Sequence, residues 1–213
     1  MVDNRKLIGL YDLNDDFLSK DEEKVFLNKI KKEIKKSDLV IVADFGHGLI
    51  TKRISRYING ISKYTSLNAQ INASNSGFHT LENYKNINTI VINASELRHE
   101  MRQRDGNIVE LGKTLQNRMK SEKIIITQGQ SGAVLIAKKK YIIAPAFSNE
   151  LVDKIGAGDT LLVLISLCLK AGFQDEVAIF VASVAAGMST ARFANSQTID
   201  KNELLNRIKY YLK

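Results

Sequence analysis

The segment 153–160 has the clearest chemical potential in this sequence. It reads DKIGAGDT and directly precedes an apolar run at 161–169. Small residues just before a helix let backbone N–H groups approach an anion at the positive end of the helix dipole. Such a site suits a phosphoryl group in transfer, and Asp159 could accept a proton from an attacking hydroxyl. The simpler alternative is a tight turn in which Asp159 only caps the helix.

Three further segments place small or polar residues at the ends of expected elements. The segment 93–96 reads NASE and follows an apolar strand, but a capped helix start would use the same residues. The segment 127–133 reads TQGQSGA and alone signals only a hairpin turn. The segment 185–190 reads AAGMST, a helical stretch with a small-residue face that leads into FANS at 193–196. Close helix packing would also explain that face.

Strands that alternate with helices indicate a parallel α/β sheet covered on both faces. The expected strands are 39–43, 66–71, 89–92 and 123–127, followed by a hairpin of 133–137 and 140–144. The expected helices are one that Ser19 caps and that runs to Lys36, then 51–61, one that opens at 95–97, 108–119, 158–170, 175–191 and 201–212. No internal repeat or low-complexity linker divides the chain, so we expect 1–213 to form a single unit.

In their order along the chain, these segments resemble the motifs of the PfkB carbohydrate kinases, the ribokinase family. The family signature reads DTTGAGD, and the residues that match it here are Asp153, Gly156, Ala157, Gly158, Asp159 and Thr160. Lys154 and Ile155 depart from the signature, and Ile155 cannot donate a side-chain hydrogen bond. The resemblance implies that Asp159 is the catalytic base and that the three small residues before it stabilise the transferring phosphoryl group.

The resemblance also assigns nucleotide and metal positions. The positions that it implies are Asn93, Glu96, Thr127, Gly129, Gly132, Asp153, Ala186 and Asn195. Glu96 would take part in the Mg²⁺ and phosphate network, since hard oxygen ligands suit Mg²⁺. The implied cofactors are ATP and Mg²⁺, with a monovalent cation as a further candidate.

The segment 44–48 reads DFGHG and points to a subfamily. It resembles the DYGKG of heptose-phosphate kinases, the kinase modules of bifunctional ADP-heptose synthesis enzymes, and this likeness runs from about 38 to 205. Asp44 and Gly46 become candidate substrate residues, although a strand-end turn would also use Asp44. His47 replaces the lysine of that group, so a charge there becomes pH-dependent.

The family's chain begins well before the strand that ends at Asp44, and that earlier part supplies a Gly-Gly motif, several strands and most sugar contacts. Residues 1–36 show no such motif. We therefore expect a three-layer ribokinase-like α/β fold with a mostly parallel central sheet, N-terminally truncated, of which 1–213 is the C-terminal, ATP-binding portion. A sheet without its front strands exposes an edge, which predicts a homo-oligomer or a partner chain that supplies the missing strands.

The expected function is ATP-dependent phosphoryl transfer to a hydroxyl of a sugar or sugar phosphate. The alternative is a non-catalytic nucleotide-binding or scaffolding remnant. A net charge of +8 raises nucleic-acid binding as a third hypothesis, which predicts steep salt dependence. The lysines, however, lie in short solvated runs without interleaved aromatic residues, so we expect no nucleic-acid partner.

Composition favours a cytoplasmic protein without a membrane partner. Hydrophobic residues make up 44% and charged residues 25% of the chain, which is ordinary for soluble domains. No stretch approaches the roughly 20 apolar residues of a membrane span, and the N-terminus has no apolar signal core. The single cysteine, Cys168, falls in the apolar run and is predicted to be a buried thiol.

Overall fold

The computed structural model describes residues 16–71, 81–147, 155–191 and 198–213. Its strands form one six-stranded sheet in the order β1-β2-β3-β4-β5-β6. The strands are β1 (Leu39–Asp44), β2 (Tyr64–Ala69), β3 (Thr89–Asn93), β4 (Lys123–Thr127), β5 (Ala133–Ile136) and β6 (Tyr141–Ala144). Strands β1 to β4 pair in parallel, whereas β4, β5 and β6 pair antiparallel. The sheet is therefore mixed. Its parallel part was predicted, and so was the hairpin of β5 and β6, which lies at one edge.

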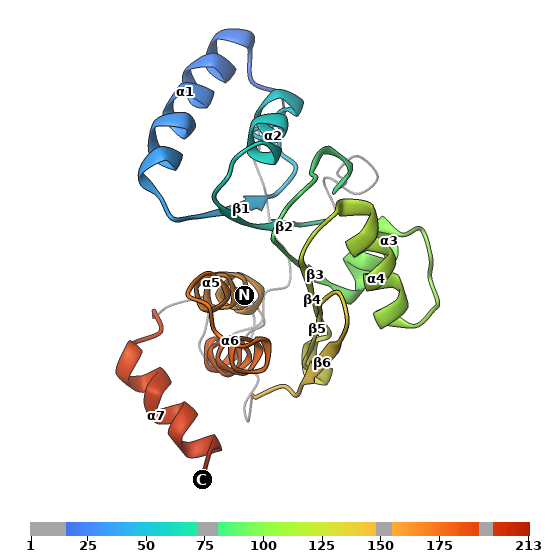
Figure 1. Cartoon of the computed structure of the whole chain (residues 1–213), viewed down its shortest axis with the longest axis vertical. Coiled ribbons are helices and arrows are strands. Elements are labelled where there is room, and N and C mark those ends of the chain that lie inside the picture. Colours follow the sequence, from blue (N-terminus) through green and yellow to red (C-terminus); the bar gives the residue numbers. More distant parts are fainter. Residues whose placement is uncertain (1–15, 72–80, 148–154, 192–197) are drawn as a thin grey trace, which may run out of the picture.

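Helices cover both faces of this sheet, as the alternation of elements predicted (Figure 1). One face is covered by α1 (Lys20–Lys36), α2 (Lys52–Asn59), α3 (Ala94–Glu100) and α4 (Ile108–Met119). The other is covered by α5 (Ala157–Lys170) and α6 (Asp175–Thr190), and α7 (Lys201–Tyr211) lies against α6. The three-layer fold is thus confirmed.

The central strands are buried on both faces, which explains their continuous apolar runs. In β4, Ile124 and Ile126 belong to the core under α3 and α4, while Ile125 points to the core under α5 and α6. In β3, Val91 likewise faces α5 and α6. This alternation follows from the two-residue period of a strand. Both cores therefore meet at β3 and β4.

Most of the predicted elements are confirmed, and the errors lie at boundaries. The strand expected at 66–71 begins at Tyr64 and ends at Ala69, because Tyr64 and Thr65 pair with Leu39 and Val40 of β1. Two short 3-10 helices, Leu81–Asn83 and Gly129–Ser131, were not predicted. Such single turns carry too few residues to show a hydrophobic period.

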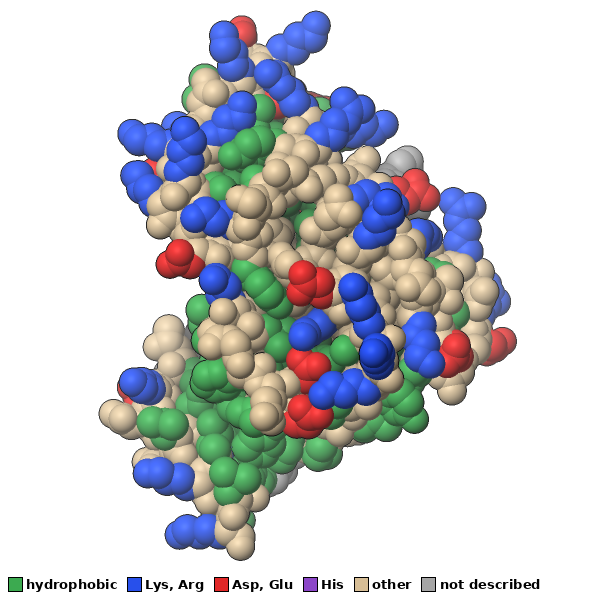
Figure 2. Space-filling view, in the orientation of Figure 1, with side chains coloured by type: hydrophobic (Ala, Val, Ile, Leu, Met, Phe, Trp, Pro, Cys, Tyr) green, Lys and Arg blue, Asp and Glu red, His purple; other side chains and the backbone are tan. Residues whose placement is uncertain are grey.

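The surface separates charge from apolar side chains. Lysine and arginine side chains gather over α1 and α2, and hydrophobic side chains over α5 and α6 (Figure 2). Val163, Leu167 and Val177 are among the exposed large hydrophobic residues on α5 and α6. Cys168, by contrast, is buried as predicted, and this burial raises the pKa of its thiol. In the described ranges, no helix combines the length and apolarity that a membrane crossing requires.

Candidate active site

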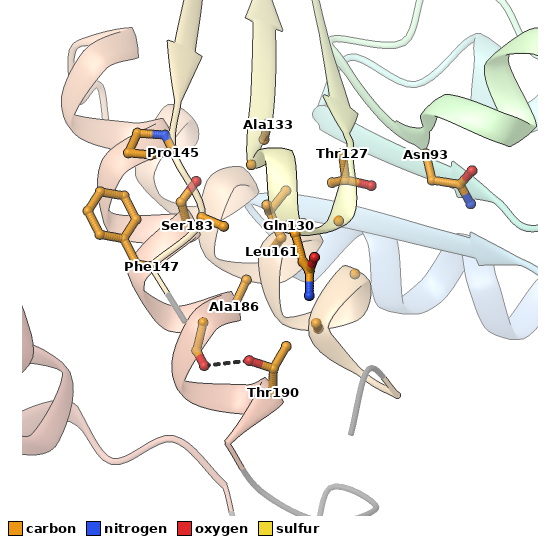
Figure 3. A pocket seen from close by; sticks show the side chains of 16 residues that line it. Asn93, Thr127, Gln130, Ala133, Pro145, Phe147, Leu161, Ser183, Ala186 and Thr190 are labelled. Carbon is orange, nitrogen blue, oxygen red and sulfur yellow. Dashed lines mark hydrogen bonds between the residues drawn. The ribbon is translucent and has the colours of Figure 1, made fainter. Parts of the chain in front are cut away.

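A cavity of about 670 Å³ lies at the carboxyl ends of β3 and β4, where α5 and α6 approach the sheet (Figure 3). Its walls come from the end of β3, the turn between β4 and β5, the chain after β6, the start of α5 and the second half of α6. This volume is typical of a site for a small organic ligand. Crevices at the carboxyl ends of parallel strands are also the usual ligand sites of open α/β sheets.

Seven residues predicted from separate segments line this one cavity. They are Asn93, Thr127, Gly129, Gly132, Ala157, Gly158 and Ala186. Gly156 and Asp159 are the chain neighbours of the lining residues Ala157 and Gly158. Glu96, Asp44 and Gly46 lie outside the lining. Asp153 and Asn195 fall outside the described residues. The fold therefore brings together most of the predicted nucleotide positions.

The start of α5 leaves its backbone open toward the cavity. Gly156 precedes the helix with φ 83°, a left-handed conformation that favours glycine, and it offers no side-chain cap. A Cβ added at Gly158 would meet no atom within 4 Å, so open space lies beside it. The first N–H groups of a helix have no intrahelical partner. Together with the positive end of the helix dipole, such N–H groups can bind an anion.

Asp159 stands in the first turn of α5, next to these N–H groups. Its side chain is exposed, yet the protein atoms around its carboxyl group partly displace water. This desolvation raises the pKa of Asp159 above its ordinary value. A raised pKa makes a carboxylate a stronger base, which suits proton removal from a hydroxyl.

Asn93 and Glu96 form a reciprocal cap at the start of α3. The Glu96 N–H donates to Asn93 Oδ1 at 2.9 Å, and the Asn93 N–H donates to Glu96 Oε2 at 2.9 Å. The Ile71 N–H donates to Glu96 Oε1 at 3.3 Å, and Glu96 is buried. The capped helix start is therefore present. It does not exclude a role in ligand binding, because Asn93 also lines the cavity.

The available side-chain ligands decide whether the site is compatible with the Mg²⁺ that the family resemblance implies. Within the described ranges, no group of three or more His, Cys, Asp or Glu side chains could hold a metal ion. Both carboxylate oxygens of Glu96 already accept backbone N–H groups. Mg²⁺ usually keeps several waters and binds substrate phosphates with few protein ligands. The residues present are compatible with Mg²⁺ bound in that mode.

The turn between β4 and β5 is built around Gly132. The Gln128 N–H donates to the Gly132 carbonyl at 2.8 Å, and Gly132 has φ 85°. A Cβ at this position would collide with the backbone oxygen of Ala144 and lie 2.7 Å from the carbonyl carbon of Pro145. Glycine is thus required where the turn packs on the chain after β6. The same turn projects Gln130 into the cavity (Figure 3).

The small-residue face of α6 serves two purposes that the sequence could not separate. Ala182 and Ala185 are fully buried in the helix packing. Ala186 and Gly187 line the cavity, and the Thr190 hydroxyl donates to the Gly187 carbonyl at 2.8 Å. Close packing and an open wall therefore lie on adjacent sides of one helix.

Several lining residues were not predicted, among them Pro145, Phe147, Leu161 and Ser183. The Phe147 ring contacts Phe180 edge-on at 5.3 Å between centroids. A signal existed for this wall: Pro145 is the only proline of the chain and follows an apolar strand directly. Nothing in the sequence pattern marked Ser183, which lies within an otherwise apolar helix.

Asp44 lies at the end of β1, away from the cavity lining. The Tyr84 hydroxyl donates to Asp44 Oδ2 at 2.5 Å, and the Gly46 N–H donates to Asp44 Oδ1 at 3.0 Å. Both Asp44 and Tyr84 are buried, and burial together with the neighbouring carboxylate raises the pKa of Tyr84. The strand-end turn is therefore observed, while a substrate role for Asp44 and Gly46 stays a prediction.

Comparisons with known proteins agree with this fold. Solved structures with the same architecture include ribokinase from Thermotoga maritima (TM-score 0.67, 17% identity, covering 84% of this chain and 59% of that one). Phosphofructokinase-2 from Escherichia coli in complex with potassium gives a TM-score of 0.75 at 13% identity, covering 92% of this chain and 64% of that one. The fold is thus that of the ribokinase-like kinases.

The family follows from the sequence match. Residues 70–202 match the model of the pfkB family carbohydrate kinases, and the chain belongs to this family. Among curated relatives, the bifunctional protein HldE of Aliarcobacter butzleri (strain RM4018) is 22% identical over 202 residues, covering 93% of this chain and 42% of that protein. The protein of the same name from Aeromonas salmonicida (strain A449) is 26% identical over 190 residues, covering 86% and 38%. The predicted resemblance is confirmed, and the chain spans about two fifths of these relatives.

Proposed function

We propose that this chain is the ATP-binding, phosphoryl-transferring portion of a carbohydrate kinase that acts on a hydroxyl of a sugar or sugar phosphate. The observation that carries the proposal is the cavity, since lining residues from four separate motif segments converge on it. The DFGHG segment and the relatives named HldE favour a heptose phosphate as acceptor. A cytoplasmic location accords with this activity.

The phosphates of ATP would lie at the open start of α5. There the backbone of Gly156, Ala157 and Gly158 would stabilise the charge on the γ-phosphoryl group. Asp159 would take the proton of the acceptor hydroxyl while the oxygen of that hydroxyl forms the new bond to phosphorus. The bond from phosphorus to the β–γ bridging oxygen breaks, and ADP leaves with that electron pair.

The other predicted positions complete this nucleotide site. Thr127, Gly129 and Gly132 would follow the phosphates, and Ala186 would face the base. Mg²⁺, when bound, would neutralise phosphate charge, with Asn93 and Glu96 organising the surrounding water. A monovalent cation stays part of the proposal because the Escherichia coli neighbour is a complex with potassium.

A second candidate is a non-catalytic nucleotide-binding or scaffolding protein. It is supported by Ile155, an exposed apolar residue where the family signature has a small or hydroxylated one. Either function would leave the exposed apolar residues of α5 and α6 available to a second copy or a partner chain.

The proposed chemistry is tested by the Asp159→Asn variant in a transfer assay with labelled ATP and a panel of sugars and sugar phosphates that includes a heptose phosphate. Loss of the base should lower the transfer rate by about 10²- to 10⁴-fold. ATP affinity should stay nearly unchanged, because the backbone anion site is intact. Retained turnover would overturn the role of Asp159, and ATP binding without transfer by the wild-type chain would favour the second candidate.

The pH dependence provides a further check. Because desolvation raises the pKa of Asp159, the acidic limb of kcat/KM should lie at higher pH than for an ordinary aspartate. The raised pKa of Asp159 also affects the stability of the fold, and this contribution falls, rather than rises, with increasing pH. A raised folded-state pKa favours the fold below the unfolded pKa, and this contribution is lost as the pH rises through the folded pKa. Asp159→Asn should therefore not lower the melting temperature at neutral pH.

A further inference from the structure

The two ends of the cavity differ in chemistry. One end presents backbone and polar groups from the start of α5 and from the β4–β5 turn. The other end is largely apolar, with walls from Pro145, Phe147 and Ala186 (Figure 3). Apolar walls beside a polar helix start match the two parts of a nucleotide, the base and the phosphates.

Ser183 is a polar exception at the apolar end. It lies on α6 beside Pro145 and Phe147 in Figure 3, and it lines the cavity. Its residue exposure is only 6%, and among the described residues its hydroxyl has no hydrogen-bond partner. Buried polar groups in folded proteins are nearly always paired, and an unpaired one disfavours the fold. An unpaired hydroxyl in a cavity wall therefore points to a partner that arrives with a ligand.

The wall around Ser183 is held in place from outside the cavity. The Phe147 ring packs edge-on against Phe180 at 5.3 Å and against Tyr211 of α7 at 4.9 Å between centroids. The Tyr211 hydroxyl also donates to the Phe147 carbonyl at 3.2 Å. A ligand at this end thus meets an ordered apolar surface, so its orientation depends on the few polar groups within reach.

We infer that Ser183 is a base-contacting residue of the nucleotide site, whose hydroxyl pairs with the polar edge of the bound base. This inference rests on the proposed function. A serine hydroxyl both donates and accepts, and rotation about one bond gives it three staggered positions. It can therefore pair with the amino group or ring nitrogen of adenine, or with the oxygen or N–H of guanine. Because a single rotating hydroxyl can pair with either base, ATP and GTP should bind with affinities within about tenfold of each other.

The test is a calorimetric titration of ATP, GTP and inorganic tripolyphosphate into the wild-type chain and its Ser183→Ala variant. Ser121→Ala is the matched control, because the Ser121 hydroxyl is also buried without a described partner but does not line the cavity. Removing either hydroxyl should leave the melting temperature unchanged or raise it, since no described hydrogen bond is lost.

Ser183→Ala should weaken binding of ATP and of GTP by about 2- to 10-fold and leave tripolyphosphate binding unchanged. Ser121→Ala should change none of the three. If the wild type binds ATP and Ser183→Ala binds it equally well, the inference fails while the proposed function stands. If the wild type binds none of the probes, the proposed function fails and the inference with it. Equal weakening of ATP and tripolyphosphate would also contradict a contact to the base.

Discussion

The two sides of the cavity differ in how far hydrogen bonds within the protein occupy their polar groups. On the closed side, which comprises Asn93, Thr127 and Gly132, every named residue takes part in internal pairing. Asn93 caps α3, Thr127 pairs with Ala133 in the sheet, and the Gly132 carbonyl accepts the Gln128 N–H. On the open side, residues 156–159, the helix begins at a glycine without a side-chain cap.

The contrast extends to the other helices. The N-cap side chains of α1, α2, α4 and α7 accept backbone N–H groups of their own first turns. Helix α6 also begins without such a cap, but no residue of its first turn lines the cavity. The start of α5 combines a missing cap with a cavity. N–H groups of a helix start that has no side-chain cap and faces a cavity can bind a ligand, whereas the internally paired side fixes the shape.

The largest expected effect is on the closed side, from Gly132→Ala. The new Cβ would collide with the Ala144 backbone, and φ 85° with ψ −138° is a glycine conformation. We expect a loss of about 3 kcal/mol or more in the free energy of unfolding. Chemical denaturation would measure it, with Gly158→Ala as the control, because that position has open space. Equal stability of the two variants would contradict the contrast.

A smaller effect is expected from Asn93→Ala, which removes the cap of α3. The loss should be about 1 kcal/mol of stability, as for other N-cap asparagines. Asn107→Ala is the matched control, because Asn107 caps α4 through Val109 and Glu110 and does not line the cavity. Both variants should melt similarly, while only Asn93→Ala should weaken ATP binding. Unchanged ATP affinity in Asn93→Ala would make that residue a structural cap alone.

Much of the fold could be predicted because its elements are strongly periodic. The apolar runs of β3 and β4 and the capped start of α1 at Ser19 are local patterns, and the structure has them where the sequence placed them. The boundaries of β2 could not be predicted in this way, because pairing with β1 extends the strand to Tyr64. Tertiary pairing decides such ends, and local propensity does not.

The candidate site shows the same division. Its motif residues were predicted from the resemblance to the PfkB kinases, because the segments that contain Thr127 and Gly158 match that family's motifs in their order along the chain. Phe147 and Ser183 were missed because each is ordinary in its own element and reaches the cavity only through the packing of α6 on the β6 end of the sheet. Glu96 was predicted as a metal-network residue, and its carboxylate turned out to be tied to two backbone N–H groups, a contact that depends on Ile71 of another segment.

The most direct test of the open side is calorimetric titration of ATP, with and without Mg²⁺, into the wild-type chain and its Gly158→Trp variant. The indole would fill the space beside the first turn of α5, while the fold should tolerate it, because a Cβ at Gly158 meets no atom within 4 Å. Gly60→Trp is the control, since Gly60 lies at the end of α2, away from the cavity lining. We expect saturable, Mg²⁺-dependent binding that Gly158→Trp loses and Gly60→Trp keeps. Full ATP affinity in a folded Gly158→Trp variant would contradict the anion site at the start of α5.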